Sequence, residues 1–217
     1  GEGGVAIEAA TSDPVVYGAA LAVAEAHVIA ARDAYRAGQN EAAAEMFAHP
    51  VSEVLLDMDP VFKTRGVADF KPLFSAASQA VIAGESVAAV DSHFDGIIAA
   101  LRGAAEKAPE NGSSAGVIAG GVVADQIERA VAMYAQAAEG DLYGPYLDGY
   151  GYYMAAKGAF ERSSDAIRAE DEALHTRITQ ALGLLAQAYP GAERPASLDV
   201  NQGKLSGASA SVMLAAG

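Results

Sequence analysis

The stretch Ser12–Gly38 reads SDPVVYGAALAVAEAHVIAARDAYRAG and indicates the fold class. It opens with Asp13 ahead of Pro14, a capping residue before a proline at the first helical position, and it ends at a glycine. Between these signals apolar residues recur at helical spacing, and most of them are alanine, which has the highest helix propensity. The stretch therefore predicts a long helix that begins near Pro14 and ends before Gly38.

Alanine-rich segments with helical periodicity continue along the rest of the chain, so the sequence predicts an all-α protein built from helical bundles. The second expected helix runs from near Glu41 to just before Pro60, with a kink or break just before Pro50. The later expected helices cover about 67–82, 86–107, 115–138, 144–163 and 165–188, with a short terminal helix at 212–214.

Glycine, proline and serine divide the chain into parts. The expected organisation is a flexible leader at 1–13, a first helical half at 14–107, a linker at 108–114, a second helical half at 115–194 and a tail at 195–217. In each half a helix ends with a tyrosine followed by a glycine, at Tyr35 and at Tyr134. Two alternatives stay open: a duplication giving two pseudo-symmetric antiparallel bundles, or a likeness of alanine-rich composition alone.

Composition narrows the functional classes. The chain has 28 acidic and 14 basic residues, a net charge of −14, which disfavours nucleic acid and anionic lipid as partners. It has no cysteine, so disulfides and thiolate–metal bonds are excluded. No uninterrupted apolar run reaches the length of a transmembrane helix, since Val117–Val123 is too short.

One segment carries a pattern typical of metal ligands. His49 and Glu53 are four residues apart, so on a helix they share a face, and Asp57 continues that face by a further turn. His27 lies about eleven residues before the expected turn at Gly38, and His49 about eleven after it. Antiparallel helices would bring both imidazoles to the same height, about 16 Å from the turn.

Each of these residues also has a structural explanation. A buried His27 could simply hydrogen-bond to a neighbour, and His49 with Glu53 could form a surface pair. His93 could complete a metal site from another helix or lie exposed among acidic residues. His175 has charged neighbours, which favours a solvated face.

A tyrosine-rich segment is the second notable pattern. Tyr146, Tyr150 and Tyr153 share one helical face, with Asp148 between them. Their phenols could face a ligand or a protein partner. Alternatively, the rings fill space that alanine leaves, with their hydroxyls reaching water, and this second interpretation is the favoured one.

Motifs of the common enzyme classes are absent: the chain has no phosphate-binding loop, dinucleotide fingerprint, serine elbow or His-Glu-x-x-His. Glu172-Ala-Leu-His175 is a single Glu-x-x-His, whereas a di-metal centre of the ferritin type needs two. The sequence therefore predicts a non-enzymatic protein, and a hydrolase with a metal-bound water ranks last.

The first half resembles the imelysin-like family of exported bacterial proteins, which includes iron-uptake components. Its signature is Gly-x-His-x-x-Glu, and the matching stretch here is Glu25-Ala-His27-Val-Ile-Ala30, in which only the histidine agrees. The resemblance implies a pair of helical bundles and a metal-related role. His49 and Glu53 would then supply the ligands that the signature glutamate does not.

These features lead to one functional expectation and one rival. We expect an exported protein, periplasmic or at the cell surface, that binds iron, copper or zinc for uptake, storage or delivery. The start at Gly1 rather than Met fits a removed signal peptide, with or without a lipid anchor. The rival is a cell-envelope interaction module without metal, whose tyrosine face contacts a protein partner.

Overall fold

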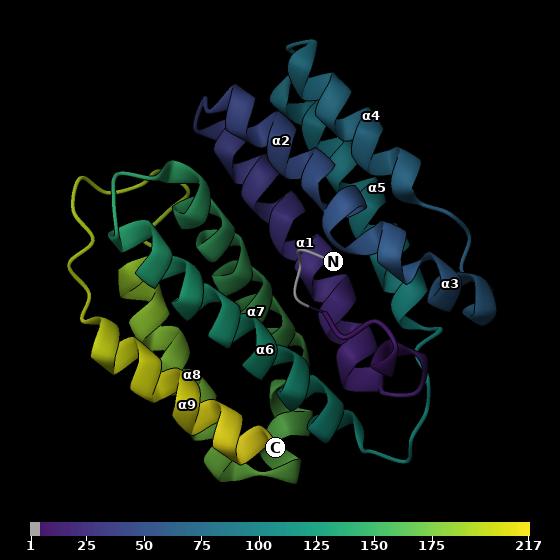
Figure 1. The fold of residues 1–217 in the computed structure, drawn as a ribbon, viewed down its shortest axis with the longest axis vertical. Helices are drawn as coiled ribbons and strands as arrows, with labels where there is room; N and C mark the ends of the chain where they lie inside the picture. The colour runs from purple at the N-terminus through teal and green to yellow at the C-terminus, as the bar shows by residue number, and fades with distance from the viewer. Residues whose placement is uncertain (1–4) are drawn as a thin grey trace. The chain divides into compact units, whose positions relative to one another are not determined.

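The computed structural model describes residues 5–217, and every regular element in that range is a helix, so the all-α prediction is confirmed (Figure 1). The chain divides into two compact units, Gly1–Asn111 and Gly112–Gly217. The division falls inside the segment 108–114 that the sequence marks as a linker.

The first unit is a ring of packed helices. Its elements are η1 (Ala9–Thr11), α1 (Pro14–Arg36), α2 (Asn40–Pro50), the π-helical turn η2 (Val51–Leu55), α3 (Leu56–Arg65), α4 (Lys71–Ile82) and α5 (Val87–Ala105). Helix α1 packs against α2 and α5, and α4 packs against the same two helices. The four longest helices therefore enclose one core, as in a four-helix bundle (Figure 1).

The start of α1 follows the predicted capping. The Asp13 side chain accepts hydrogen bonds from the amides of Val15 and Val16, and Pro14 occupies the first turn. Residues 1–4 of the expected leader lie outside the described residues. Within 5–13, however, η1 buries Ala10, and Arg65 donates a hydrogen bond to the Thr11 carbonyl at 2.9 Å. This part of the expected flexible leader is thus tied to α3.

The helical path after α2 is longer than predicted. It passes Pro50 through η2 and passes Pro60 within α3, ending only at Gly66, whose φ of 69° is the left-handed conformation of a helix stop. Pro60 is exposed, so the carbonyl that it leaves unbonded can meet water, while Phe62 on the same helix is buried. Burial of the apolar side therefore outweighs the proline signal.

Three other predicted boundaries were wrong for local reasons. Helix α4 begins at Lys71 rather than 67, because Asp69 caps the Lys71 amide and Pro72 sits in the first turn. The boundary predicted at 163–165 is at Asp171, which caps the next helix by accepting from Ala173 and Leu174. The terminal helix starts at Gln202, well before 212, with Asn201 as its cap.

The second unit is also a ring. It contains α6 (Ala115–Ala138), α7 (Tyr143–Glu170), α8 (Glu172–Ala188) and α9 (Gln202–Ala216). Helix α6 packs against α7 and α9, and α8 packs against the same two (Figure 1). Each unit therefore closes four helices into a ring, which in the first unit leaves α3 outside it. Both a duplication and independent bundle packing can produce this arrangement.

Helix α1 is long and apolar enough to cross a membrane, by length and composition alone, which the sequence expectation of no such segment overlooked. In the structure, 83% of its most apolar window is buried. Buried core helices and signal sequences pass the same composition test, so this finding is weak evidence for a span.

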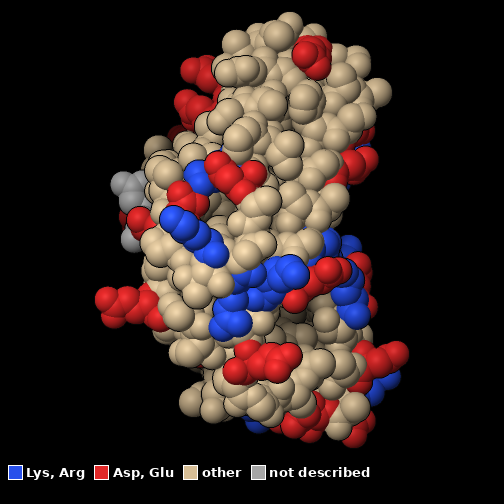
Figure 2. Space-filling model, turned by 90° about the vertical axis from the view of Figure 1, so that its right-hand side faces the viewer, with Lys and Arg blue, Asp and Glu red and all other residues tan. Residues whose placement is uncertain are grey.

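Acidic side chains are spread over the face drawn in Figure 2, whereas basic side chains gather across its middle with acidic ones beside them. Ion pairs of the first unit illustrate this local compensation. Arg36 contacts Asp91 at 2.9 Å, and the Lys71 ammonium contacts both Asp59 and Asp69. Exposed pairs of this kind contribute little stability each.

The core of the second unit is organised around Tyr189. Its hydroxyl donates to the Ala130 carbonyl at 2.6 Å, and its ring contacts those of Tyr134, Tyr146 and Tyr153 at centroid distances of 5.3–6.2 Å. Gly149 makes this possible, because a Cβ there would lie 1.9 Å from the Tyr189 hydroxyl oxygen. Gly149 therefore allows α7 to pack closely against the side chain of Tyr189.

Gly149→Ala should destabilise the protein by about 1–3 kcal/mol, because the buried and hydrogen-bonded Tyr189 cannot give way to the new methyl group. Urea unfolding measures the difference. The matched control is Gly183→Ala in α8, where a Cβ meets nothing within 4 Å. It should gain about 0.5–1 kcal/mol through lower unfolded-state entropy. Equal stability of wild type and Gly149→Ala would refute the packing role.

Candidate metal centre

Helix α1 holds His27 in a fixed orientation inside the first unit. The side chain is buried, with 3% of the residue exposed, and Nδ1 lies 2.8 Å from the Val23 carbonyl one turn earlier. A carbonyl can only accept, so Nδ1 must carry the proton of this hydrogen bond. The other ring nitrogen, Nε2, is thereby directed toward the neighbouring helical segment. Metal-binding histidines are commonly oriented by such a backbone contact.

That segment is η2, which carries Glu53. Pro50 has no amide hydrogen and its ring crowds the carbonyl four residues earlier, so the regular α-helix cannot continue unchanged past it. The chain instead forms a π-helical turn over Val51–Leu55, which is wider than an α-helical turn. Glu53 Oε2 lies 2.9 Å from His27 Nε2.

His49 completes the cluster from the last turn of α2. Its Nδ1 lies 3.7 Å from Glu53 Oε1, and its ring centroid is 6.2 Å from that of His27. A ligand nitrogen of each histidine lies within 4.8 Å of the other. The His49 Nδ1 atom is inaccessible to solvent, yet it has no hydrogen-bond partner among residues 5–217.

Electrostatics keep Glu53 ionised. Burial of the carboxyl opposes ionisation, but the hydrogen bond from His27 and the charges of His27 and His49 outweigh it and lower the pKa of Glu53 below its usual 4.5. Since Nδ1 of His27 already donates to Val23, the 2.9 Å contact between Nε2 and Glu53 requires either a proton or another cation between the two atoms.

Imidazole and carboxylate are side-chain types that bind transition-metal ions in proteins. Ligand atoms bound at about 2.0–2.2 Å in a tetrahedral arrangement lie roughly 3.3–3.6 Å apart. The two nitrogen–oxygen separations, 2.9 Å from His27 to Oε2 of Glu53 and 3.7 Å from His49 to Oε1, lie below and above that range. His49 has a side chain 43% exposed, so it has room to rotate toward a shared ion. Two imidazole nitrogens and one carboxylate suit zinc, copper or iron better than calcium.

An ion pair between a buried glutamate and a half-exposed arginine braces the helix that presents His27. Glu25 is 6% exposed, and both its oxygens accept from the Arg102 guanidinium of α5 at 2.7 Å. This bidentate bond raises the pKa of Arg102. One turn beyond His27, the Arg32 guanidinium lies 4.1 Å over the Phe94 ring. Sequence reasoning missed these two contacts, although a lone glutamate in an apolar helix was a visible signal for the first.

Other residues proposed as ligands have different surroundings. Asp57 is exposed on α3. The His93 side chain on α5 is 35% exposed, and its Nε2 is 3.9 Å from Glu85. His175, which the sequence assigns to a solvated face and not to the ligands, is half-buried in the second unit and forms a 2.8 Å hydrogen bond with the Ser164 hydroxyl.

The tyrosine face lies in the core of the second unit. Tyr146 is fully buried and donates to the Gly191 carbonyl at 2.7 Å, and burial raises its pKa to about 12, so the phenol stays protonated. Tyr153 stacks on Tyr189. Tyr150 is buried and Asp148 half-buried on the same helix, α7. The ring packing of Tyr146 and Tyr153 agrees with the space-filling alternative, but the Tyr146 hydroxyl bonds a carbonyl instead of reaching water.

Comparison with known proteins adds no relative. No protein-family model, curated protein or solved structure matches the chain. A functional proposal therefore depends on the local geometry of the first unit.

Glu53→Gln should lower the unfolding free energy of the chelator-treated protein by about 1–3 kcal/mol at pH 7, because it removes a buried, charge-assisted hydrogen bond. The folded pKa of Glu53 is depressed, so its contribution is present above the ordinary value of 4.5 and is lost as pH falls through the lower folded value. The deficit relative to wild type should therefore shrink below about pH 4.5.

Denaturant unfolding from pH 7 to pH 3 measures this dependence. Glu45→Gln, at an exposed position on α2, is the control and should match wild type throughout. A deficit of constant size down to pH 3 would mean that the ionised carboxylate is not the stabilising species.

Proposed function

We propose that the first unit binds one transition-metal ion through His27, His49 and Glu53. The observation that carries the proposal is the buried His27 Nε2, 2.9 Å from the Glu53 carboxylate, beside a second histidine nitrogen without a hydrogen bond. A divalent cation would satisfy both nitrogens and the carboxylate at once, which a single proton cannot do.

Iron, copper and zinc are the candidate metals, because borderline ions favour imidazole together with carboxylate. Three protein ligands leave a coordination position for water or an exogenous ligand. The chain supplies binding and orientation here: Val23 holds the His27 ring, and the Glu25–Arg102 pair braces α1 against α5.

The biological role that we propose is uptake, storage or delivery of the metal by an exported, imelysin-like protein of the periplasm or cell surface. His27 at the histidine position of the family signature supports this role. Fractionation of the native host tests the location: recovery of the protein in the cytoplasm would overturn the exported part of the proposal.

A second candidate function is a non-catalytic interaction module of the cell envelope. The observation that favours it is the apolar end of α9, where Leu214 is 82% exposed and Met213 is 38% exposed. Exposed apolar side chains that lie together are typical of contact surfaces. The tyrosine face suits this role less, since Tyr146 is buried.

The purified protein should bind one ion per chain when titrated with zinc, copper or ferrous iron at pH 7.5. His49→Ala and Glu53→Gln should each weaken binding by at least about tenfold, because each removes a ligand from a small set. Affinity should also fall between pH 7.5 and pH 5.5, because a histidine must lose its proton to bind a metal. Calorimetry, with elemental analysis of the eluted protein, measures these quantities.

His93→Ala is the matched control, because it removes a histidine from the same unit that pairs instead with Glu85. Its affinity should equal that of wild type. If a protein with both His49→Ala and Glu53→Gln still bound the metal tightly, these residues would not be the metal ligands. Absence of binding by the wild type would leave the interaction module as the better account.

A further inference from the structure

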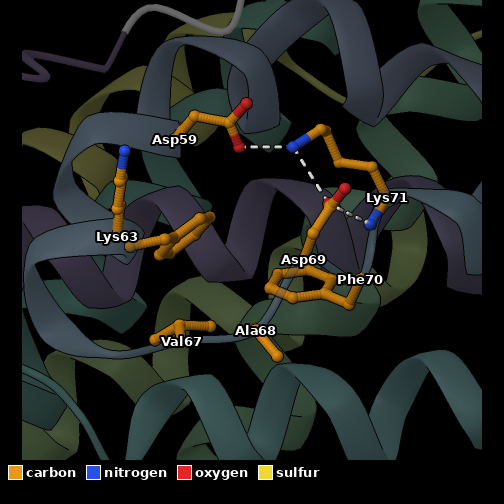
Figure 3. Close-up of a pocket in the computed structure, with 8 residues that line it drawn as sticks. Asp59, Lys63, Val67, Ala68, Asp69, Phe70 and Lys71 are labelled. Carbon is orange, nitrogen blue, oxygen red and sulfur yellow. Dashed lines mark hydrogen bonds and ion pairs between the residues drawn. The ribbon is translucent and has the colours of Figure 1, made fainter.

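A pocket of about 370 Å³ opens where α3 ends and α4 begins, apart from His27, His49 and Glu53 (Figure 3). Its walls come from α3, from the connecting loop and from the first residue of α4. Figure 3 shows Asp59, Lys63 and Lys71 toward one side of the space, and Val67 with Ala68 toward the opposite side. The pocket therefore has a charged side and an apolar side.

The aromatic wall of the pocket is already in place. Phe62 and Phe70 line it, are 6% and 8% exposed, and lie with their ring centroids 5.5 Å apart. Phe62 also packs edge-on against Tyr17, and Phe70 packs against Phe74. Core residues therefore hold both rings in place, so little side-chain entropy would be lost when a ligand packs against them.

The charges of the lining are unequally compensated. Lys71 contacts both Asp59 and Asp69, and these hydrogen bonds raise the pKa of Lys71 and lower that of Asp69, so Lys71 and Asp69 stay charged near neutral pH. Lys63 lines the same pocket but forms no ion pair with any residue in the range 5–217. It is the cation available to a ligand.

We propose that this pocket binds a small organic monoanion whose carboxylate pairs with Lys63 and whose aromatic or branched aliphatic body lies against Phe62, Phe70 and Val67. The proposal is independent of metal binding. It assigns a second ligand site to the first unit, built from an apolar wall and one unpaired cation.

Size and charge both favour this class. Small-molecule pockets span ~300–1,000 Å³, so 370 Å³ admits a single ring with a short acid chain rather than a nucleotide. An organic cation would have to compete with Lys71 for the carboxylates of Asp59 and Asp69, which Lys71 already contacts. It would also be repelled by the positive charge of Lys63. A carboxylate supplies the missing partner of Lys63.

The test uses 3-phenylpropionate as the probe and the whole protein, treated with chelator to empty any metal site. Ligand-observed NMR and calorimetry should give a Kd of about 1 mM or tighter. Two probes serve as controls: 2-phenylethylamine, with the opposite charge, and acetate, without the apolar body. Each should bind at least about tenfold more weakly.

Two variants at exposed positions locate the site without disturbing the core. Lys63→Gln should weaken 3-phenylpropionate about three- to tenfold, and Ala68→Phe, which fills the apolar side, should reduce binding at least tenfold. Lys107→Gln, an exposed lysine elsewhere in the unit, should leave the affinity unchanged. If Ala68→Phe fails to fold, Lys63→Gln with Lys107→Gln decides alone.

Three results would overturn the proposal. These are equal affinity for the acid and the amine, equal affinity for acetate and 3-phenylpropionate, or full affinity in Lys63→Gln. Absence of binding at 10-fold above the expected Kd of about 1 mM would do the same.

Discussion

The contact between His27 and Glu53 is the constraint on which the first unit's chemistry depends. A buried imidazole and a half-buried carboxylate are costly to remove from water, so each must be satisfied by a partner of opposite character. The Val23 carbonyl satisfies one ring nitrogen, and Glu53 faces the other. Either a proton or a metal ion must therefore lie between His27 Nε2 and the Glu53 carboxylate. In both cases the cation links α1 to η2, the turn that follows α2.

The π-helical turn gives that contact its geometry. Pro50 prevents an unbroken α-helix, and the chain responds with a wider turn instead of a break. Such turns are frequent at functional sites. Here Glu53 faces His27 across the turn, while Val54 and Leu55 on the same turn lie in the core. The π-helical turn thus contributes side chains both to the core and to the candidate site.

Polar side chains in the two units illustrate two kinds of surroundings. In the second unit, the hydroxyls of Tyr146 and Tyr189 donate hydrogen bonds to backbone carbonyls. These two polar groups are therefore satisfied within the core. In the first unit, the His49 Nδ1 atom lacks a hydrogen-bond partner and Lys63 lacks an ion pair among the described residues. A buried polar atom without a partner costs stability unless a ligand completes it, which supports the proposal for His49. Lys63 is exposed, so its proposal rests on the lining of the pocket instead.

The sequence alone determined the all-α class, the start of α1 at Pro14 and the register that brings His27 and His49 to one height, because capping, periodicity and helical rise are local properties. It could not determine that the helix continues past Pro60, that Glu25 pairs with Arg102, or that Phe62 and Phe70 wall a pocket. Those outcomes depend on burial and on partners distant in the chain, whose energies outweigh local propensity once the helices pack.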